Sequence, residues 1–229
     1  TLISHNEYLL ACAREEMTPS NIFNCPGLLL DHLAVDSMHA GDLGSFQDAV
    51  GSLFWVEITT KAWHRNRAVG LARLNTALNL FYTANRDRGF SKLTPLVLSQ
   101  LMAKDPGYPY LKAKAAQTRH VAEFAAILAR THMHGNSTRP PFQFLATSGL
   151  AGHTQEHLQN LVDMCEGMAA YHRACSSFPF EHEPCRRAMY QFLQSLAALN
   201  TLWRSGLPEA AQKKQPFHLR QKAHVLQHL

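Results

Sequence analysis

The feature that most constrains the fold of this chain is helical periodicity, which follows one short aliphatic segment. Apolar residues through 43–204 recur at the three- to four-residue spacing that places side chains on one face of an α-helix. The sequence LLLDHLAVD at 28–36 is different, because it is short, aliphatic and ends at an acidic residue, as buried β-strands often do. The sequence therefore predicts a mainly α fold with one short strand. A lone strand leaves its backbone groups unpaired, so we expect its partner strands to lie upstream of Thr1.

Capping and chain-breaking residues divide the helical part into separate elements. Ser4, with Glu7 three positions later, forms a capping-box pattern, and Asp42 is placed to cap a second helix. Segments rich in proline, glycine and polar residues at 134–141 and 205–216 are predicted linkers. Helices are predicted at 4–17, from 42 to about 58, at 67–84, about 95–103, 110–132, about 150–175 and about 183–204.

Composition narrows the class of protein. No run approaches the roughly 18 apolar residues that a membrane span needs, and the N-terminal residues lack a signal-peptide pattern. We therefore expect an intracellular protein without membrane contact. The five cysteines are an odd number with no C-x-x-C pair, which favours reduced thiols over a disulfide framework. The net charge of +5 permits nucleic-acid binding but is equally typical of a basic globular protein.

The clearest candidate site lies at the end of the predicted strand. Asp36 is the last residue of that strand, and His39 follows three positions later. Two-metal phosphoryl-transfer sites need carboxylates placed at such positions, because paired Mg²⁺ ions stabilise the attacking and leaving oxygens. On spacing alone there is an alternative, in which Asp36 and Asp42 cap the turn and the following helix without taking part in chemistry.

Three segments carry a resemblance to a known family. The sequence VDSMHAGDLGSFQDAVGSLFW at 35–55 resembles the CACTA-like group of cut-and-paste DNA transposases, in which such a pattern surrounds the second catalytic aspartate. The sequence YPYLKAKAAQTRH at 108–120 resembles a Lys- and Ala-rich helix that follows this aspartate in the family. The sequence FHLRQKAHVLQHL at 217–229 resembles the segment after the helical region, with Gln221 where the family usually has proline. The resemblance spans most of the chain, and the first motif is its specific part.

The resemblance implies a ribonuclease-H-like catalytic core that is interrupted by a helical insertion. It also implies Mg²⁺-dependent cleavage and transfer of DNA strands in the nucleus. Asp36 would be the second metal-binding acid, with His39 as its companion. The first acid would lie before Thr1 and the third beyond Leu229, so we expect this chain alone to be inactive, because one carboxylate cannot hold two Mg²⁺ ions. The implied regions are a partial core at 1–60, the helical insertion at 61–216 and a return toward the core at 217–229.

Two further groups could supply metal ligands. Glu166 is a candidate third acid if the insertion is short, and the alternative is a solvated carboxylate on a helix. The sequence HTQEH at 153–157 matches the H-x-x-E-H arrangement of one class of zinc peptidases. A chain with 14 histidines produces such a match by chance, and no second motif supplies a third ligand.

Basic residues predict contacts with DNA. Lys112, Lys114 and Arg119 lie in a segment where acidic residues are scarce, and Lys222 belongs to another basic cluster near the end of the sequence. On the predicted helix, Lys112 and Arg119 share a face. Since no helix-turn-helix or zinc-finger pattern is present, we expect backbone contacts rather than base reading. The alternative is a non-catalytic helical module that binds DNA or protein, and a homo-oligomer is compatible with both.

Overall fold

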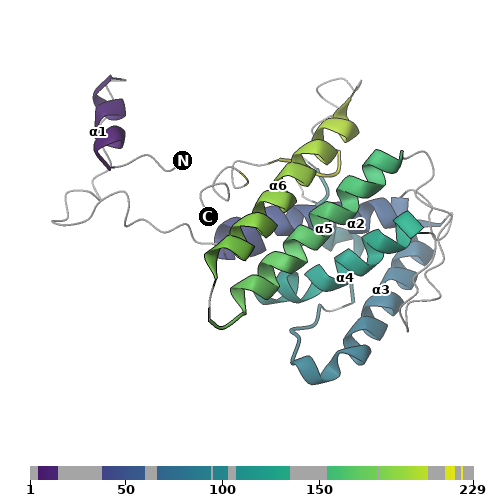
Figure 1. Ribbon diagram of the computed structural model, residues 1–229. Coiled ribbons are helices and arrows are strands. Elements are labelled where there is room, and N and C mark those ends of the chain that lie inside the picture. Colours follow the sequence, from purple (N-terminus) through teal and green to yellow (C-terminus); the bar gives the residue numbers. More distant parts are fainter. Residues whose placement is uncertain are drawn as a thin grey trace.

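In the computed structural model of the chain, the α-helices between residues 46 and 204 pack into a bundle (Figure 1). The structure describes residues 5–14, 38–59, 66–93, 95–102, 107–134, 154–179, 181–205, 215–219 and 223. The α-helices are α1 (His5–Arg14), α2 (Phe46–Thr59), α3 (Arg67–Ala84), α4 (Ala115–His134), α5 (Gln155–Cys175) and α6 (His182–Arg204). The shorter elements are the π-helical turn η3 (Met38–Ser45) and the 3-10 turns η4 (Arg86–Arg88) and η5 (Leu98–Gln100). Within these ranges there is no β-strand beyond an isolated bridge between Met102 and Pro109. The prediction of a mainly α fold is confirmed.

The predicted strand at 28–36 lies outside the described residues. The strand, the ribonuclease-H-like core and the three predicted regions of the chain therefore stay predictions.

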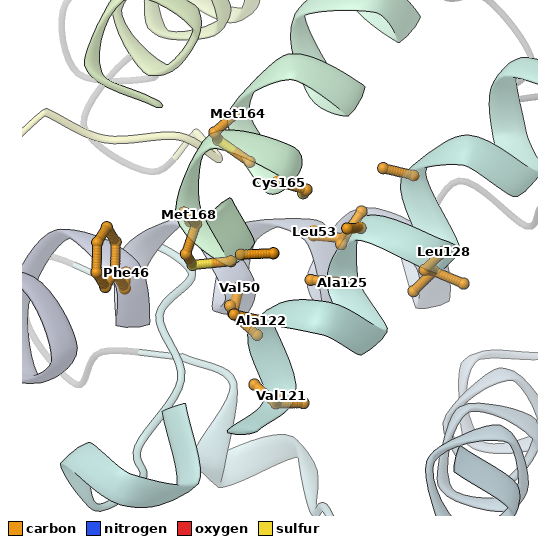
Figure 2. Close-up of a cluster of buried hydrophobic side chains, with 14 of the residues drawn as sticks. Phe46, Val50, Leu53, Val121, Ala122, Ala125, Leu128, Met164, Cys165 and Met168 are labelled. Carbon is orange, nitrogen blue, oxygen red and sulfur yellow. The ribbon is translucent and has the colours of Figure 1, made fainter. Parts of the chain in front are cut away.

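Helix α2 runs through the centre of the bundle. All of its residues except Trp55 and Thr59 are buried, because α3, α4 and α5 contact it from different sides. A helix in this position is buried around most of its circumference, and its polar side chains Gln47, Ser52 and Glu57 are hydrogen-bonded to other segments. Figure 2 shows the centre of this core, in which the labelled side chains come from α2 (Phe46, Val50, Leu53), α4 (Val121, Ala122, Ala125, Leu128) and α5 (Met164, Cys165, Met168).

Helices α5 and α6 form an antiparallel hairpin, seen at the front of Figure 1. Their backbones approach each other closely at Gly167 of α5. A Cβ atom at this position would lie 2.7 Å from the backbone nitrogen of Phe192 and 2.9 Å from the carbonyl oxygen of Ala188. Glycine is therefore the residue that lets these two helices pack with their backbones in contact.

The start of the helix predicted at 110–132 is wrong, because α4 begins only at Ala115. The backbone N–H of Leu111 donates to the carbonyl oxygen of Gln47 in α2 over 2.9 Å, and the Gln47 amide donates to the carbonyl oxygen of Ala113 over 2.6 Å. These bonds hold residues 110–113 extended across α2, where Gly51 leaves room for them. A helix would need those same backbone groups, so tertiary contacts override the local preference.

Other helix boundaries follow the sequence to different degrees. The prediction at 67–84 is confirmed by α3, whose first turn is capped by the Asn66 side chain, which accepts from the N–H of Ala68 over 2.9 Å. The helix expected at about 95–103 is wrong, since the structure has there only the single 3-10 turn η5. The helix expected from 42 begins at Phe46, after η3, which is kinked at Gly44. Asp42 is therefore not the cap of that helix.

Candidate functional site

The structure describes only part of the predicted site. Asp36 and Lys222 lie outside the described residues, so the expected contact between Asp36 and His39 stays a prediction. His39 is exposed in η3. Lys112 and Lys114 are exposed in the extended segment before α4, whereas Arg119 lies on α4. The prediction that Lys112 and Arg119 share one helix face is therefore wrong, because the helix starts after Lys112.

A buried carboxylate fixes the segment that follows His39 onto the helical bundle. Asp42, three residues beyond His39 and also in η3, is 2% exposed. One of its oxygens, Oδ2, accepts from Nη2 of Arg119 on α4 over 2.8 Å. The other, Oδ1, lies 3.3 Å from Nε2 of His172 on α5. We call Asp42, Arg119 and His172 the η3 clamp, because the carboxylate of η3 is bound by Arg119 of α4 and packs against His172 of α5, where Oδ1 and Nε2 are in contact without a hydrogen bond.

Burial and charge oppose each other within the η3 clamp. Burial raises the pKa of Asp42, and the hydrogen bond and positive charge of Arg119 offset part of that rise. The pKa of His172 is lowered to about 3, first by burial and then by the positive charges of Arg119 and His120. His172 is therefore neutral at pH 7, and Arg119 supplies the positive charge that faces the carboxylate.

A pocket of about 220 Å³ opens beside the η3 clamp, between α4, α5 and the segment around η4. Arg119 and His172 of the clamp are part of its wall. The remaining lining residues are Arg88, Phe90, His120, Ala122, Glu123, Ala169, Arg173 and Ser176. Three guanidinium groups therefore face the pocket together with one carboxylate, and this surplus of positive charge suits an anion.

Stacked side chains build one wall of the pocket. The His120 ring stacks on Phe90 with 4.8 Å between centroids, and its Nδ1 accepts from the backbone N–H of Ser91 over 2.7 Å. The guanidinium of Arg88 lies 4.5 Å above the Phe90 ring and pairs with both oxygens of Glu123, one at 2.8 Å. These contacts order Arg88 and His120 before any ligand binds, which lowers the entropy lost on binding.

The three arginines of the pocket differ in how far they are already paired. Arg88 is paired with Glu123, and Arg119 uses Nη2 for Asp42. Arg173 is exposed and, among the residues that the structure describes, pairs with no carboxylate. Arg173 is therefore the cation of this pocket that is most available to an incoming anion, and its removal would not leave a buried partner unpaired.

The other candidate metal ligands have structural partners. Glu166 forms an ion pair with Arg130 over 3.4 Å between α5 and α4. In the HTQEH sequence, Nδ1 of His157 lies 2.7 Å from the Thr154 hydroxyl oxygen, while His153 lies outside the described residues. No group of three His, Cys, Asp or Glu side chains suited to a metal occurs in the described part of the chain.

One further acidic–imidazole contact lies in the core. Glu57 of α2 and His132 of α4 are hydrogen-bonded, and both side chains are fully buried. No substrate could reach this pair without unfolding, so its role is to join α2 to α4.

The described residues near the end of the chain also pack on α2. Phe217 is buried, its backbone N–H donates to the Ser52 hydroxyl over 2.8 Å, and its ring meets that of Trp203 edge-on. His218 stacks on Tyr108 with 4.9 Å between ring centroids.

The sequence alone predicts neither the η3 clamp nor the pocket. The sequence predicts only a capping role for Asp42, because its partner Arg119 is 77 residues away and no local pattern joins the two. Arg88 and Arg173 have no motif around them. The one usable signal was the position of Asp42 directly after the Asp36–His39 pair.

Among the described residues, no helix has the length and apolar character required to cross a bilayer. Comparisons with protein-family models, curated proteins and solved structures gave no match to this chain.

Proposed function

We propose that this chain is the part of a cut-and-paste transposase-like protein that holds the Asp36-x-x-His39 motif on a helical domain and binds the DNA backbone. The observation that carries this proposal is the η3 clamp. It fixes the segment directly after the motif to α4 through the ion pair of the buried Asp42 with Arg119, and it packs this segment against His172 of α5. A metal-binding acid needs such a rigid support, because catalytic groups work only when held within a fraction of an ångström of their productive position.

The pocket beside the clamp supports the DNA-binding part of the proposal. Backbone phosphates are recognised by arginine and lysine side chains, and the guanidinium fork fits phosphate oxygens well. Arg173 and the unused N–H groups of Arg119 provide such donors close to the motif-bearing segment. Lys112 and Lys114 are exposed just before α4 and remain candidate phosphate contacts. The net charge of +5 favours the same partner.

The Mg²⁺ part of the proposal rests on Asp36 and on the family resemblance. Paired Mg²⁺ ions in a complete site would stabilise the attacking and leaving oxygens of a phosphodiester. The described residues contain no cluster of side chains that could bind these Mg²⁺ ions. The role that we propose for the described residues is to support the motif and to contact DNA. The strand cleavage and transfer reaction is proposed for a protein that also contains the other acids.

The test is a binding titration of the 229-residue chain with two fluorescent duplexes of unrelated sequence at low salt. The Arg173→Ala variant should bind both duplexes about five- to tenfold more weakly, because one phosphate contact of about 1 to 1.4 kcal/mol is lost. Arg187→Ala is the matched control, because Arg187 is an exposed arginine on α6 whose charge is already paired with Glu183 over 3.3 Å. It should bind as the unmodified chain does.

Two results would overturn the proposal. If the chain binds neither duplex at low salt, the alternative of a helical module that binds another protein becomes the better account. If Arg173→Ala weakens binding to one duplex only, this pocket reads sequence, and a backbone contact is the wrong description.

A further inference from the structure

We propose that Cys175 and Cys185 form a redox modification site, in which a peroxide converts the two thiols into a reversible disulfide. The sulfur atoms of the two residues lie 3.7 Å apart. Cys175 is the last residue of α5, and Cys185 lies near the start of α6. The disulfide would tie the end of one helix to the start of the next, and the proposal does not depend on DNA binding.

The geometry of the hairpin allows this bond. A disulfide has a sulfur–sulfur distance of about 2.05 Å, so the sulfurs need to approach by roughly 1.6 Å from their 3.7 Å separation. This shift falls at the turn that connects α5 to α6, where Cys175, Ser176, Ser177 and Phe178 are all exposed. Side-chain rotation and a small movement of this turn can provide it, whereas the hairpin further along is held by the tight contact at Gly167.

The environments of the two thiols set the order of the reaction. Cys175 is exposed to solvent, whereas Cys185 is 6% exposed and its pKa is raised to about 11 by burial and by the contact with Cys175. The Cys175 thiolate is therefore the group that attacks the peroxide, breaking the O–O bond to give a sulfenic acid and hydroxide. The Cys185 sulfur then attacks the Cys175 sulfur, and the departing hydroxide takes the thiol proton as water. With hydrogen peroxide, two thiols and one peroxide give one disulfide and two waters.

The other described thiols should not take part. Cys12 is 2% exposed, and Cys165 is fully buried in the core. Burial raises the pKa of Cys165, so its reactive thiolate form is scarce as well as inaccessible. The structure thus selects one pair of thiols among the described cysteines.

Peptide mapping after mild oxidation tests the proposal. The folded, reduced chain is treated with hydrogen peroxide, its free thiols are alkylated, and it is digested with trypsin. Cleavage after Arg173 and Arg186 gives the peptide 174–186, which contains both cysteines. This peptide should lose two hydrogens, resist alkylation, and recover both thiols after treatment with dithiothreitol. A second digestion between the two cysteines should leave its fragments joined.

Variants separate this site from general thiol oxidation. Cys185→Ser should leave Cys175 as a sulfenic acid that dimedone traps, and the disulfide should be absent. Cys12→Ser is the matched control and should form the disulfide as the unmodified chain does. The proposal is overturned if Cys175 and Cys185 both stay alkylatable after oxidation, if either pairs mainly with another cysteine, or if the disulfide appears at the same rate in urea-unfolded protein.

Discussion

Replacing Gly51 with alanine tests whether the segment before α4 lies across α2 as the structure shows. A Cβ atom at this position would lie 2.2 Å from the backbone nitrogen of Leu111 and 2.2 Å from the carbonyl carbon of Tyr110. Both contacts are with backbone, so no side-chain rotation can relieve them. The segment would have to move by more than an ångström to reach ordinary contact distance, which begins at 3.4 Å.

The magnitude follows from what this displacement breaks. Overpacking of a core contact costs about 1 to 3 kcal/mol. The two hydrogen bonds between Gln47 and residues 111 and 113 contribute about 1 kcal/mol each. Alanine regains about 1 kcal/mol because it is the better helix former. We therefore expect Gly51→Ala to lower the free energy of unfolding by about 2 to 4 kcal/mol.

Urea denaturation followed by far-ultraviolet circular dichroism measures this change. Gly70→Ala is the matched control, because Gly70 is also in a helix but its Cβ would meet the Ile58 Cα at 3.6 Å, an ordinary contact. It should leave stability unchanged or raise it by up to about 1 kcal/mol. If Gly51→Ala and Gly70→Ala unfold at the same urea concentration, the extended segment does not lie where the structure places it.

Three further substitutions probe the η3 clamp and the α5–α6 hairpin. Arg119→Ala should lower the free energy of unfolding by about 1 to 3 kcal/mol at pH 7. This loss is smaller than for a fully buried ion pair, because Arg119 is half-exposed and solvent screens its charge. Since the pKa of Asp42 is raised in the folded state, the deficit should shrink as pH falls and the carboxylate takes up a proton, and a deficit independent of pH would contradict this. Neutral His172, with its pKa lowered to about 3 from 6.5, favours folding above pH 6.5, and this contribution is lost as pH falls toward 3. Between pH 6.5 and 3, the His172→Gln variant should therefore lose less stability than the unmodified chain. If both proteins show the same pH profile, His172 does not cause the loss. Gly167→Ala should lower stability by about 1 to 3 kcal/mol, because its Cβ would meet the Phe192 backbone at 2.7 Å, and thermal unfolding of the variant would show no shift if the hairpin were looser.

Local sequence patterns predicted some helices well. They failed where contacts with residues far away in the sequence determine the backbone conformation. The helix at 67–84 was found because Asn66 caps its first turn and its apolar spacing is regular. The start of α4 was misplaced because Gln47, far away in the sequence, binds the backbone of residues 111 and 113. No window of neighbouring residues contains that information.

The candidate site shows the same division between local and distant information. The sequence pattern around Asp36 and His39 directed attention to the segment in which Asp42 lies. That Asp42 is a buried anchor depends on Arg119 and His172, which come from two helices later in the chain. Arg173, the pocket cation proposed as the main phosphate contact, could be identified only once α5 had been placed beside α4.

The salt dependence of DNA binding tests the central proposal most directly. Each phosphate contact releases counterions, so the logarithm of the binding constant should fall linearly with the logarithm of salt concentration, by about 0.9 per contact. If the pocket cations contact the backbone, the unmodified chain should show a steep negative slope on both unrelated duplexes. Arg173→Ala should flatten that slope by about 0.9, and the Arg187→Ala control should not. Binding that does not change with salt, or an Arg173→Ala slope equal to that of the unmodified chain, would contradict the account.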